Sequence, residues 1–138
     1  MIFEQYIVNR DDYANAGKVS SKVKQKLSLL GVSSDVLRRI AVACYEAEIN
    51  MVIHAYGGYI NLFISDAGII QLVFKDLGPG INDLEKALTP GWSTASEKAR
   101  QLGFGAGMGL VNIKRVSDEF DIVSCPEGTT LTIGFKVS

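Results

Sequence analysis

The chain has 138 residues, a length that fits one domain and can bury a hydrophobic core without disulfides or metal ions. Hydrophobic residues make up 47% of the sequence, charged residues 21%, and the formal net charge is −1, which is typical of a globular protein and indicates no surface for binding nucleic acid. No apolar stretch is long enough to span a membrane and no signal peptide begins the chain, so we expect a cytoplasmic protein whose Cys44 and Cys125 are reduced core thiols.

The first 30 residues predict one strand and one helix. Residues 3–10 have the composition of a short strand, after which Asp11 or Asp12 can cap a helix. Apolar residues then recur at spacings of three and four, which indicates one buried helix face, and Gly31 can end that helix. The members of this stripe are Ala16, Val19, Val23, Leu27 and Leu30.

The middle of the chain predicts a long helix and a β-hairpin. A serine at position 33 or 34 can begin a helix that runs to about Tyr56 and ends at a pair of glycines. Residues 59–65 and 69–76 are apolar, strand-forming runs, and the Asp-Ala-Gly sequence between them is a turn signal. We therefore expect these two strands to pair as a hairpin.

The last third of the chain predicts a long loop, a helix and a second hairpin. Residues 77–106 are rich in glycine, proline and polar side chains, and a helix is expected to begin near Gly107. Residues 119–125 and 129–137 are strands joined by a Pro-Glu-Gly turn. This order of elements predicts an α+β fold for residues 1–138 as one domain: a two-layer sandwich with helices on one face of a mixed, mainly antiparallel sheet.

Polar residues interrupt the apolar composition of the long helix at steps of four. Glu46, Asn50 and His54 span about 80° of its circumference, whereas Glu48 lies about 200° from Glu46 and is expected to be solvated or paired with a lysine of the first helix. An asparagine oxygen beside phosphates and water suits Mg²⁺, and a carboxylate one turn away can accept a proton. The alternative is a polar stripe at a seam between two helices.

The second hairpin strand ends in an acidic residue that two glycines follow closely. Asp76 closes the strand, and Gly78 and Gly80 come next. A carboxylate in this position can accept a hydrogen bond from the amino group of adenine, and glycines let the base approach the backbone. The alternative is an ordinary turn that needs no ligand.

A glycine-rich segment precedes the third helix. Glycines on alternate residues before an amphipathic helix expose backbone N–H groups to an anion, and the helix dipole favours negative charge there. Neither a P-loop nor a dinucleotide-binding fingerprint fits, because no Gly-Lys-Ser/Thr and no βαβ unit are present. A flexible hinge is the alternative. The glycines are Gly103, Gly105, Gly107 and Gly109.

Taken together, four motifs resemble the GHKL superfamily of ATP-binding domains, which includes gyrase, heat-shock chaperones, mismatch-repair ATPases and histidine kinases. They are E-x-x-x-N-x-x-x-H-A (46–55), D-x-G-x-G-I (76–81), G-x-G-x-G-L (105–110) and G-T-T (128–130). The resemblance covers almost the whole chain. It implies the Bergerat fold, ATP and Mg²⁺ as cofactors, and a lid over the nucleotide at about 82–106.

The resemblance also implies a role for each motif residue. Asn50 would hold Mg²⁺ and Glu46 would be the general base, while Asp76 would bind adenine and Thr129 would lie on the adenine side. The strand period supports the last assignment, because it puts Thr129 on the same face as the apolar residues of its strand. The other expected ATP-binding residues are His54, Gly78, Gly80, Ile81, Gly103, Gly105, Gly107, Met108, Gly109 and Leu110.

Within the superfamily, a domain of this length resembles the bacterial serine/threonine kinases and anti-sigma factors of partner-switching pathways. That branch implies phosphorylation of a STAS-domain antagonist protein, with a sigma factor or another downstream regulator as a second partner. Neither nucleic acid nor a membrane is expected to bind directly, and a homodimer is compatible with the sequence. The alternatives are an ATP-dependent binding module, a free-standing ATPase, and a histidine kinase that acts on a separate protein.

Overall fold

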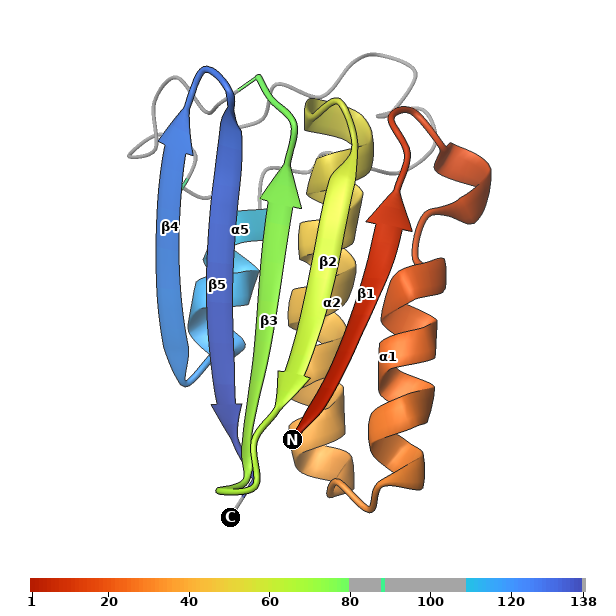
Figure 1. Ribbon diagram of the computed structural model, residues 1–138, viewed down its shortest axis with the longest axis vertical. Coiled ribbons are helices and arrows are strands. Elements are labelled where there is room, and N and C mark those ends of the chain that lie inside the picture. The colour runs from red at the N-terminus through yellow and green to blue at the C-terminus, as the bar shows by residue number, and fades with distance from the viewer. Residues whose placement is uncertain (80–87, 89–108, 138) are drawn as a thin grey trace.

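The structure, a computed structural model, describes residues 1–79, 88 and 109–137. A first strand, two hairpins, three α-helices and a short 3-10 helix make up this part of the chain (Figure 1). In chain order the elements are β1 (Ile2–Val8), η1 (Tyr13–Asn15), α1 (Lys18–Leu29), α2 (Ser34–His54), β2 (Gly58–Ile64), β3 (Ile69–Asp76), α5 (Gly109–Val116), β4 (Glu119–Cys125) and β5 (Gly128–Lys136).

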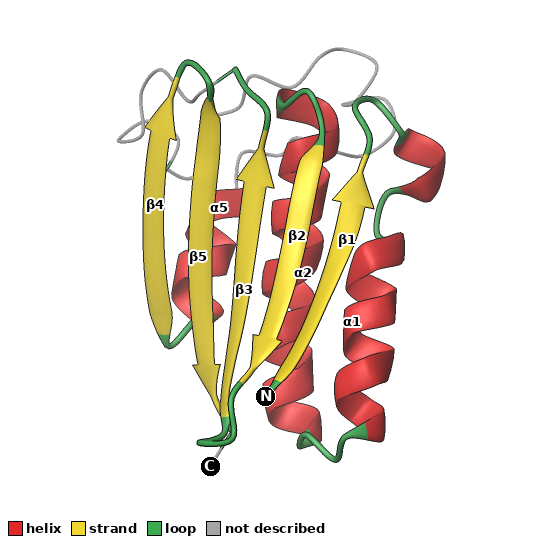
Figure 2. Cartoon of the chain, in the orientation of Figure 1, coloured by secondary structure: helices red, strands yellow, loops and turns green. Residues whose placement is uncertain are grey.

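The five described strands form one sheet in the order β1-β2-β3-β5-β4. Every pairing in it is antiparallel, so these strands show none of the parallel pairing that a mixed sheet would contain. The helices α1, α2 and α5 lie together behind the sheet, with α2 between the other two (Figure 2). The predicted α+β sandwich with its helices on one face is therefore confirmed.

The hydrophobic core lies between the two layers. From α1 it receives Val23 and Leu27, which are fully buried, and the strands contribute alternate residues such as Leu72 and Ile133. The predicted stripe of α1 is thus largely correct, but Leu30, which follows the last residue of the helix, is 50% exposed. Leu110 of α5 is also part of this core.

Helix α2 begins where the sequence predicted, whereas the expected cap of α1 is wrong. The Oγ of Ser33 accepts a hydrogen bond from the backbone N–H of Val36 at 3.5 Å and caps α2. Helix α1 instead begins after Gly17, and neither Asp11 nor Asp12 caps it. Its backbone N–H groups find another acceptor, Glu48, described below.

The two cysteines differ in their surroundings. Cys44 is fully buried on α2, and burial raises the pKa of its thiol to about 12. Cys125 is exposed at the end of β4, so the expectation of a core thiol is wrong there. Both are free thiols.

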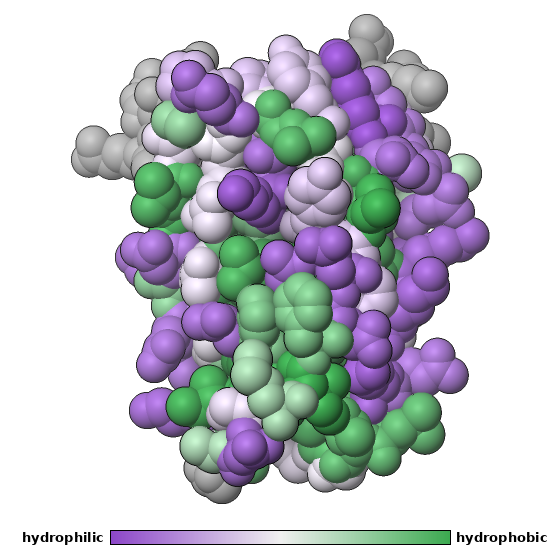
Figure 3. All heavy atoms as spheres, in the orientation of Figure 1, coloured by the Kyte–Doolittle hydropathy of each residue, from purple (hydrophilic) through white to green (hydrophobic). Residues whose placement is uncertain are grey.

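None of the described helices covers the other face of the sheet (Figure 2), whose surface Figure 3 shows. Hydrophobic side chains reach its surface among polar ones, and the rings of Phe3 and Phe63 pack there with centroids 4.9 Å apart. Among the described helices, none has the length and hydrophobicity to cross a membrane.

Candidate functional site

Two residues of the polar stripe of α2, Glu46 and Asn50, face helix α5. Glu46 and Asn50 are both partly buried, one turn apart. A Cβ added at Gly109, the first residue of α5, would lie 3.1 Å from both side-chain polar atoms of Asn50. A side chain at position 109 would press against Asn50, so glycine favours this close approach. The structure thus places the asparagine of the first motif against the helix that follows the glycine-rich segment.

Glu46 has an unusual environment for a carboxylate. Burial raises its pKa above the ordinary value, and a hydrogen bond from the side chain of Asn112 on α5 opposes that rise. Asn112 is not among the site residues predicted from the sequence. The sequence spacing could have predicted its position, because Asn112 follows Gly109 by three residues and therefore lies one turn further along the same side of α5.

Asp76 joins the second motif to the last strand. Its Oδ1 accepts hydrogen bonds from the backbone N–H of Gly78 at 3.0 Å and of Thr129 at 2.8 Å. A Cβ at Gly128 would lie 2.3 Å from the carbonyl oxygen of Asp76, so the two strands approach as closely as a glycine allows. The structure therefore brings together Asp76, Gly78 and Thr129, three residues that sequence analysis assigned to the adenine side.

Backbone hydrogen bonds tie the end of α2 to the loop after Asp76. The N–H of Tyr56 donates to the carbonyl oxygen of Gly78 at 2.7 Å, and the N–H of Leu77 donates to that of Gly57 at 3.0 Å. The end of α2, the end of β3 and the start of β5 all lie at the upper end of the molecule as drawn in Figure 1. The backbone of His54 belongs to this end of α2.

Glu48 behaves differently from the prediction. It is neither solvated nor paired with a lysine, because its side chain is 2% exposed and accepts four hydrogen bonds from the start of α1. Oε2 accepts from the backbone N–H groups of Gly17 at 3.0 Å and Val19 at 3.2 Å, and Oε1 from the N–H and Oγ of Ser20 at 2.9 and 2.7 Å. The first N–H groups of a helix lack partners within it, and this carboxylate supplies them.

Part of the predicted site lies outside the described residues. This holds for the predicted lid at about 82–106, apart from the single described position 88, and for the side chain of His54. Six further predicted residues lie there: Gly80, Ile81, Gly103, Gly105, Gly107 and Met108.

The donor set at this site suits a hard, hydrated cation held largely by a ligand. In the part of the chain that is described, no group of three or more His, Cys, Asp or Glu side chains could hold a metal ion. Asn50 offers one amide oxygen at the start of α5, where a helix favours anions such as phosphate. Mg²⁺ commonly takes one or two protein ligands and completes its shell with phosphate oxygens and water. The residues present fit that arrangement.

The fold and site together define a class of protein. A two-layer α+β domain with helices behind one face of its sheet, an E-x-x-x-N helix against a glycine-led helix, and a strand-end aspartate paired with Thr129 has the architecture of the GHKL type. The chain belongs to the histidine kinase-like ATPase domain family, whose sequence model matches residues 10–135.

The chain is similar in sequence to bacterial anti-sigma factors and to a serine/threonine-protein kinase. The chain is 34% identical over 112 residues to an anti-sigma F factor of Halalkalibacterium halodurans, covering 76% of this chain and 73% of the relative. It is 33% identical over 106 residues to the serine/threonine-protein kinase RsbT of Bacillus subtilis, covering 74% of each.

A solved structure shares the fold. The RsbU and RsbW domains of a Mycobacterium tuberculosis protein superpose with a TM-score of 0.66 at 18% identity. The match covers 97% of this chain and 32% of that one, so the present chain spans about a third of its length. A mycobacterial sensor histidine kinase, MprB, matches with a TM-score of 0.56 over 98% of this chain.

Proposed function

We propose that this protein is an anti-sigma regulatory factor and serine/threonine kinase that binds Mg-ATP and phosphorylates a STAS-domain antagonist protein. The observation that carries the proposal is the contact between Asn50 and Gly109. This contact brings Asn50 of α2 to the start of α5, and the N-terminus of a helix is suited to binding anions such as phosphate. Glu46, whose pKa is raised, lies one turn away on α2. The family and the names of the sequence relatives support it.

Each described site residue has one task in this proposal. Asn50 holds the cation against the phosphates, where Mg²⁺ would neutralise the charge that develops during transfer. Oδ2 of Asp76 accepts a hydrogen bond from the amino group of adenine, because the hydrogen bonds that described residues donate to this carboxylate, from Gly78 and Thr129, both go to Oδ1. Those two bonds fix the plane of the carboxylate before any nucleotide arrives.

Glu46 acts as the general base on the protein acceptor. It takes the proton from a serine or threonine hydroxyl of the partner while the oxygen attacks the terminal phosphate and ADP leaves. A carboxylate whose pKa lies above the ordinary value is a stronger base than an exposed glutamate, provided it stays ionised at the working pH. The hydrogen bond from Asn112 helps to keep Glu46 ionised, because it opposes the rise in the pKa of Glu46.

Nucleotide binding is tested first, by isothermal titration of the protein with a non-hydrolysable ATP analogue, with and without Mg²⁺. We expect Mg²⁺-dependent binding that Asn50→Ala weakens by about tenfold or more, since one metal ligand is lost. The matched control is Asn61→Ala, an asparagine on the open face of the sheet. Absence of binding to the wild-type protein would refute the proposal.

The acceptor is tested with ATP labelled on its terminal phosphate and STAS-domain proteins from the same organism. Acid-stable label on a serine or threonine of one of them is the expected result. Acid-labile label would instead identify a histidine kinase acting on a separate protein. Phosphate release without any protein acceptor would identify a free-standing ATPase, and binding without turnover would identify an ATP-dependent binding module.

A further inference from the structure

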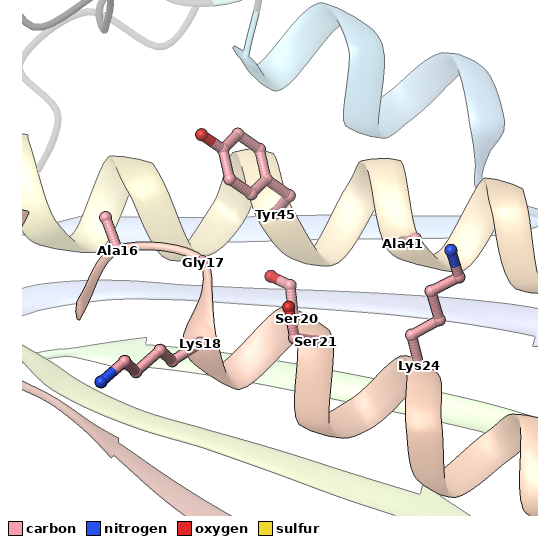
Figure 4. Close-up of a pocket in the computed structure, with 8 residues that line it drawn as sticks. All are labelled: Ala16, Gly17, Lys18, Ser20, Ser21, Lys24, Ala41 and Tyr45. Atoms are coloured by element: carbon pink, nitrogen blue, oxygen red, sulfur yellow. The ribbon is translucent and has the colours of Figure 1, made fainter. Parts of the chain in front are cut away.

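A second concave surface lies between α1 and α2. It is a groove of about 400 Å³ that shares no residue with the predicted nucleotide site (Figure 4). Small residues on both helices line this space: Gly17, Ser20 and Ser21 on the side of α1, and Ala41 on α2. Side chains this short cannot fill the gap between two helices.

The groove is built on a fixed floor. Gly17 and Ser20 both line it, and both donate hydrogen bonds to the buried carboxylate of Glu48 beneath them. Tyr45 of α2 closes one end against α1, since a Cβ at Gly17 would lie 3.0 Å from its ring. The spacing of the two helices is therefore set before anything binds, which lowers the entropic cost of binding.

The rim of the groove is basic, although the whole chain is slightly acidic. Helix α1 contains four lysines and no acidic residue, against a net charge of −1 for the chain. Lys26 pairs with Glu4, whereas Lys18 and Lys24, which line the groove, form no ion pair with any described residue. In Figure 4 Lys24 extends toward Ala41, and Lys18 points outward at the opposite end.

We propose that the groove between α1 and α2 binds an acidic segment of a partner protein. Carboxylates of the segment pair with Lys18 and Lys24, which are about 9 Å apart along the helix axis, and a small apolar side chain enters beside Tyr45. No carboxylate lines the groove, so its charge selects an acidic occupant. The inference rests on the proposed function only in assuming that the protein has a protein partner.

The probe is a fluorescein-labelled amphipathic peptide of about 20 residues, long enough to form a helix, with glutamates on one face and alanine and leucine on the other. A counterpart with lysine in place of glutamate controls for the apolar face. We expect the acidic peptide to bind saturably at low ionic strength and the basic one not to bind. Added salt should weaken the binding, because rim charges are screened.

Charge-reversal variants locate the site on α1. Lys18→Glu combined with Lys24→Glu should lower the affinity at least tenfold. Lys22→Glu is the matched control, since Lys22 is an exposed lysine of the same helix that does not line the groove, and it should change the affinity less than twofold. Ser21→Trp, at an exposed position, should also abolish binding by filling the groove without altering its charge.

Each contrary result overturns the inference. These results are no binding of the acidic peptide to the wild-type protein, an equal loss in Lys22→Glu, or full binding by Ser21→Trp. Displacement of the peptide by duplex DNA would identify a nucleic acid as the occupant. A wild-type dimer in sedimentation that the double variant abolishes would identify a second copy of the chain. Titration with the ATP analogue runs in parallel, so failure of the nucleotide site is recorded independently of the groove.

Discussion

Two glutamates of α2, separated by one residue, lie in opposite environments. Glu46 faces α5, where burial raises its pKa and the side chain of Asn112 is its hydrogen-bond partner. Glu48 faces α1 and accepts four hydrogen bonds from the start of that helix. The helical period accounts for the separation, because two residues advance about 200° around α2.

The two carboxylates differ in how far hydrogen bonds compensate for the water they have lost. Four donors compensate Glu48 for the loss of water, so its charge stabilises the packing of α1 on α2. Glu46 has lost part of its water without comparable compensation, which raises its affinity for a proton. Replacing either residue therefore tests a different property: transfer activity for Glu46 and stability for Glu48.

Glu46→Gln should impair phosphotransfer more strongly than any other substitution proposed for this site. Loss of the general base should lower the rate of transfer by about 10²- to 10⁴-fold, while binding of ATP is retained. Stability at neutral pH should hold or rise. The pKa of Glu46 is raised in the folded protein, so its ionised form destabilises the fold above that pKa, and glutamine removes this cost. Single-turnover transfer assays and urea unfolding measure the two quantities, and undiminished transfer would remove Glu46 from the role.

Glu48 should show the reverse pattern. Glu48→Ala leaves three backbone N–H groups and the hydroxyl of Ser20 without their acceptor, which should lower the free energy of unfolding by about 3 kcal/mol or more. Glu48→Gln keeps one oxygen acceptor and should lose less. The control is Glu119→Ala on the exposed side of β4, expected within about 0.5 kcal/mol of wild type. A Glu48→Ala protein as stable as wild type in urea would show that the four bonds contribute nothing net.

Periodicity was enough to predict the fold and to put Glu46 and Glu48 on different sides of α2. Periodicity could not predict which residues of other elements contact Glu46 and Glu48. The partner of Glu48 depends on where α1 begins, and α1 begins after Gly17, whose N–H donates to Glu48, rather than at the aspartates that the sequence suggested as caps. Contacts of this kind arise between elements that are far apart in sequence, which local propensity does not encode.

The candidate site came from motif resemblance more than from spacing. Each motif alone also fitted a seam, a turn or a hinge, and only the fold brings Asn50 to Gly109 and Asp76 to Thr129. Cys125 shows a related limit. Alternation along β4 predicts two faces, but the sequence does not say that this residue lies at the exposed end of an edge strand.

A smaller effect is expected at Asp76, on affinity rather than on turnover. In Asp76→Asn the remaining oxygen should still accept from Gly78 and Thr129, which directs the new NH₂ group to the position of Oδ2. Two amino groups would then face each other, so the affinity for the ATP analogue should fall about 10- to 100-fold without unfolding. Calorimetry and thermal melting measure both, with Asp121→Asn on the exposed side of β4 as the control. Unchanged affinity would refute the adenine assignment.

The smallest effect is expected from replacing Asn112, the amide partner of Glu46. It tests whether this hydrogen bond contributes to the difference between the two glutamates. The bond from Asn112 lowers the pKa of Glu46, so Asn112→Ala should let that pKa rise further. The base is then protonated at higher pH, and the acidic limb of the pH–rate profile for phosphotransfer moves upward in pH. Asn112→Asp should move it further, because a second carboxylate disfavours ionisation of the first.

At pH values above this limb, the rate of Asn112→Ala should approach that of wild type, since the base is fully ionised in both proteins. A structural role for Asn112 predicts something else, namely a lower rate at every pH together with a lower free energy of unfolding. Asn61→Ala, on the open face of the sheet, should leave the limb where it is. If the limb of Asn112→Ala coincides with that of wild type, Asn112 does not set the proton affinity of Glu46, and burial alone distinguishes this glutamate from Glu48.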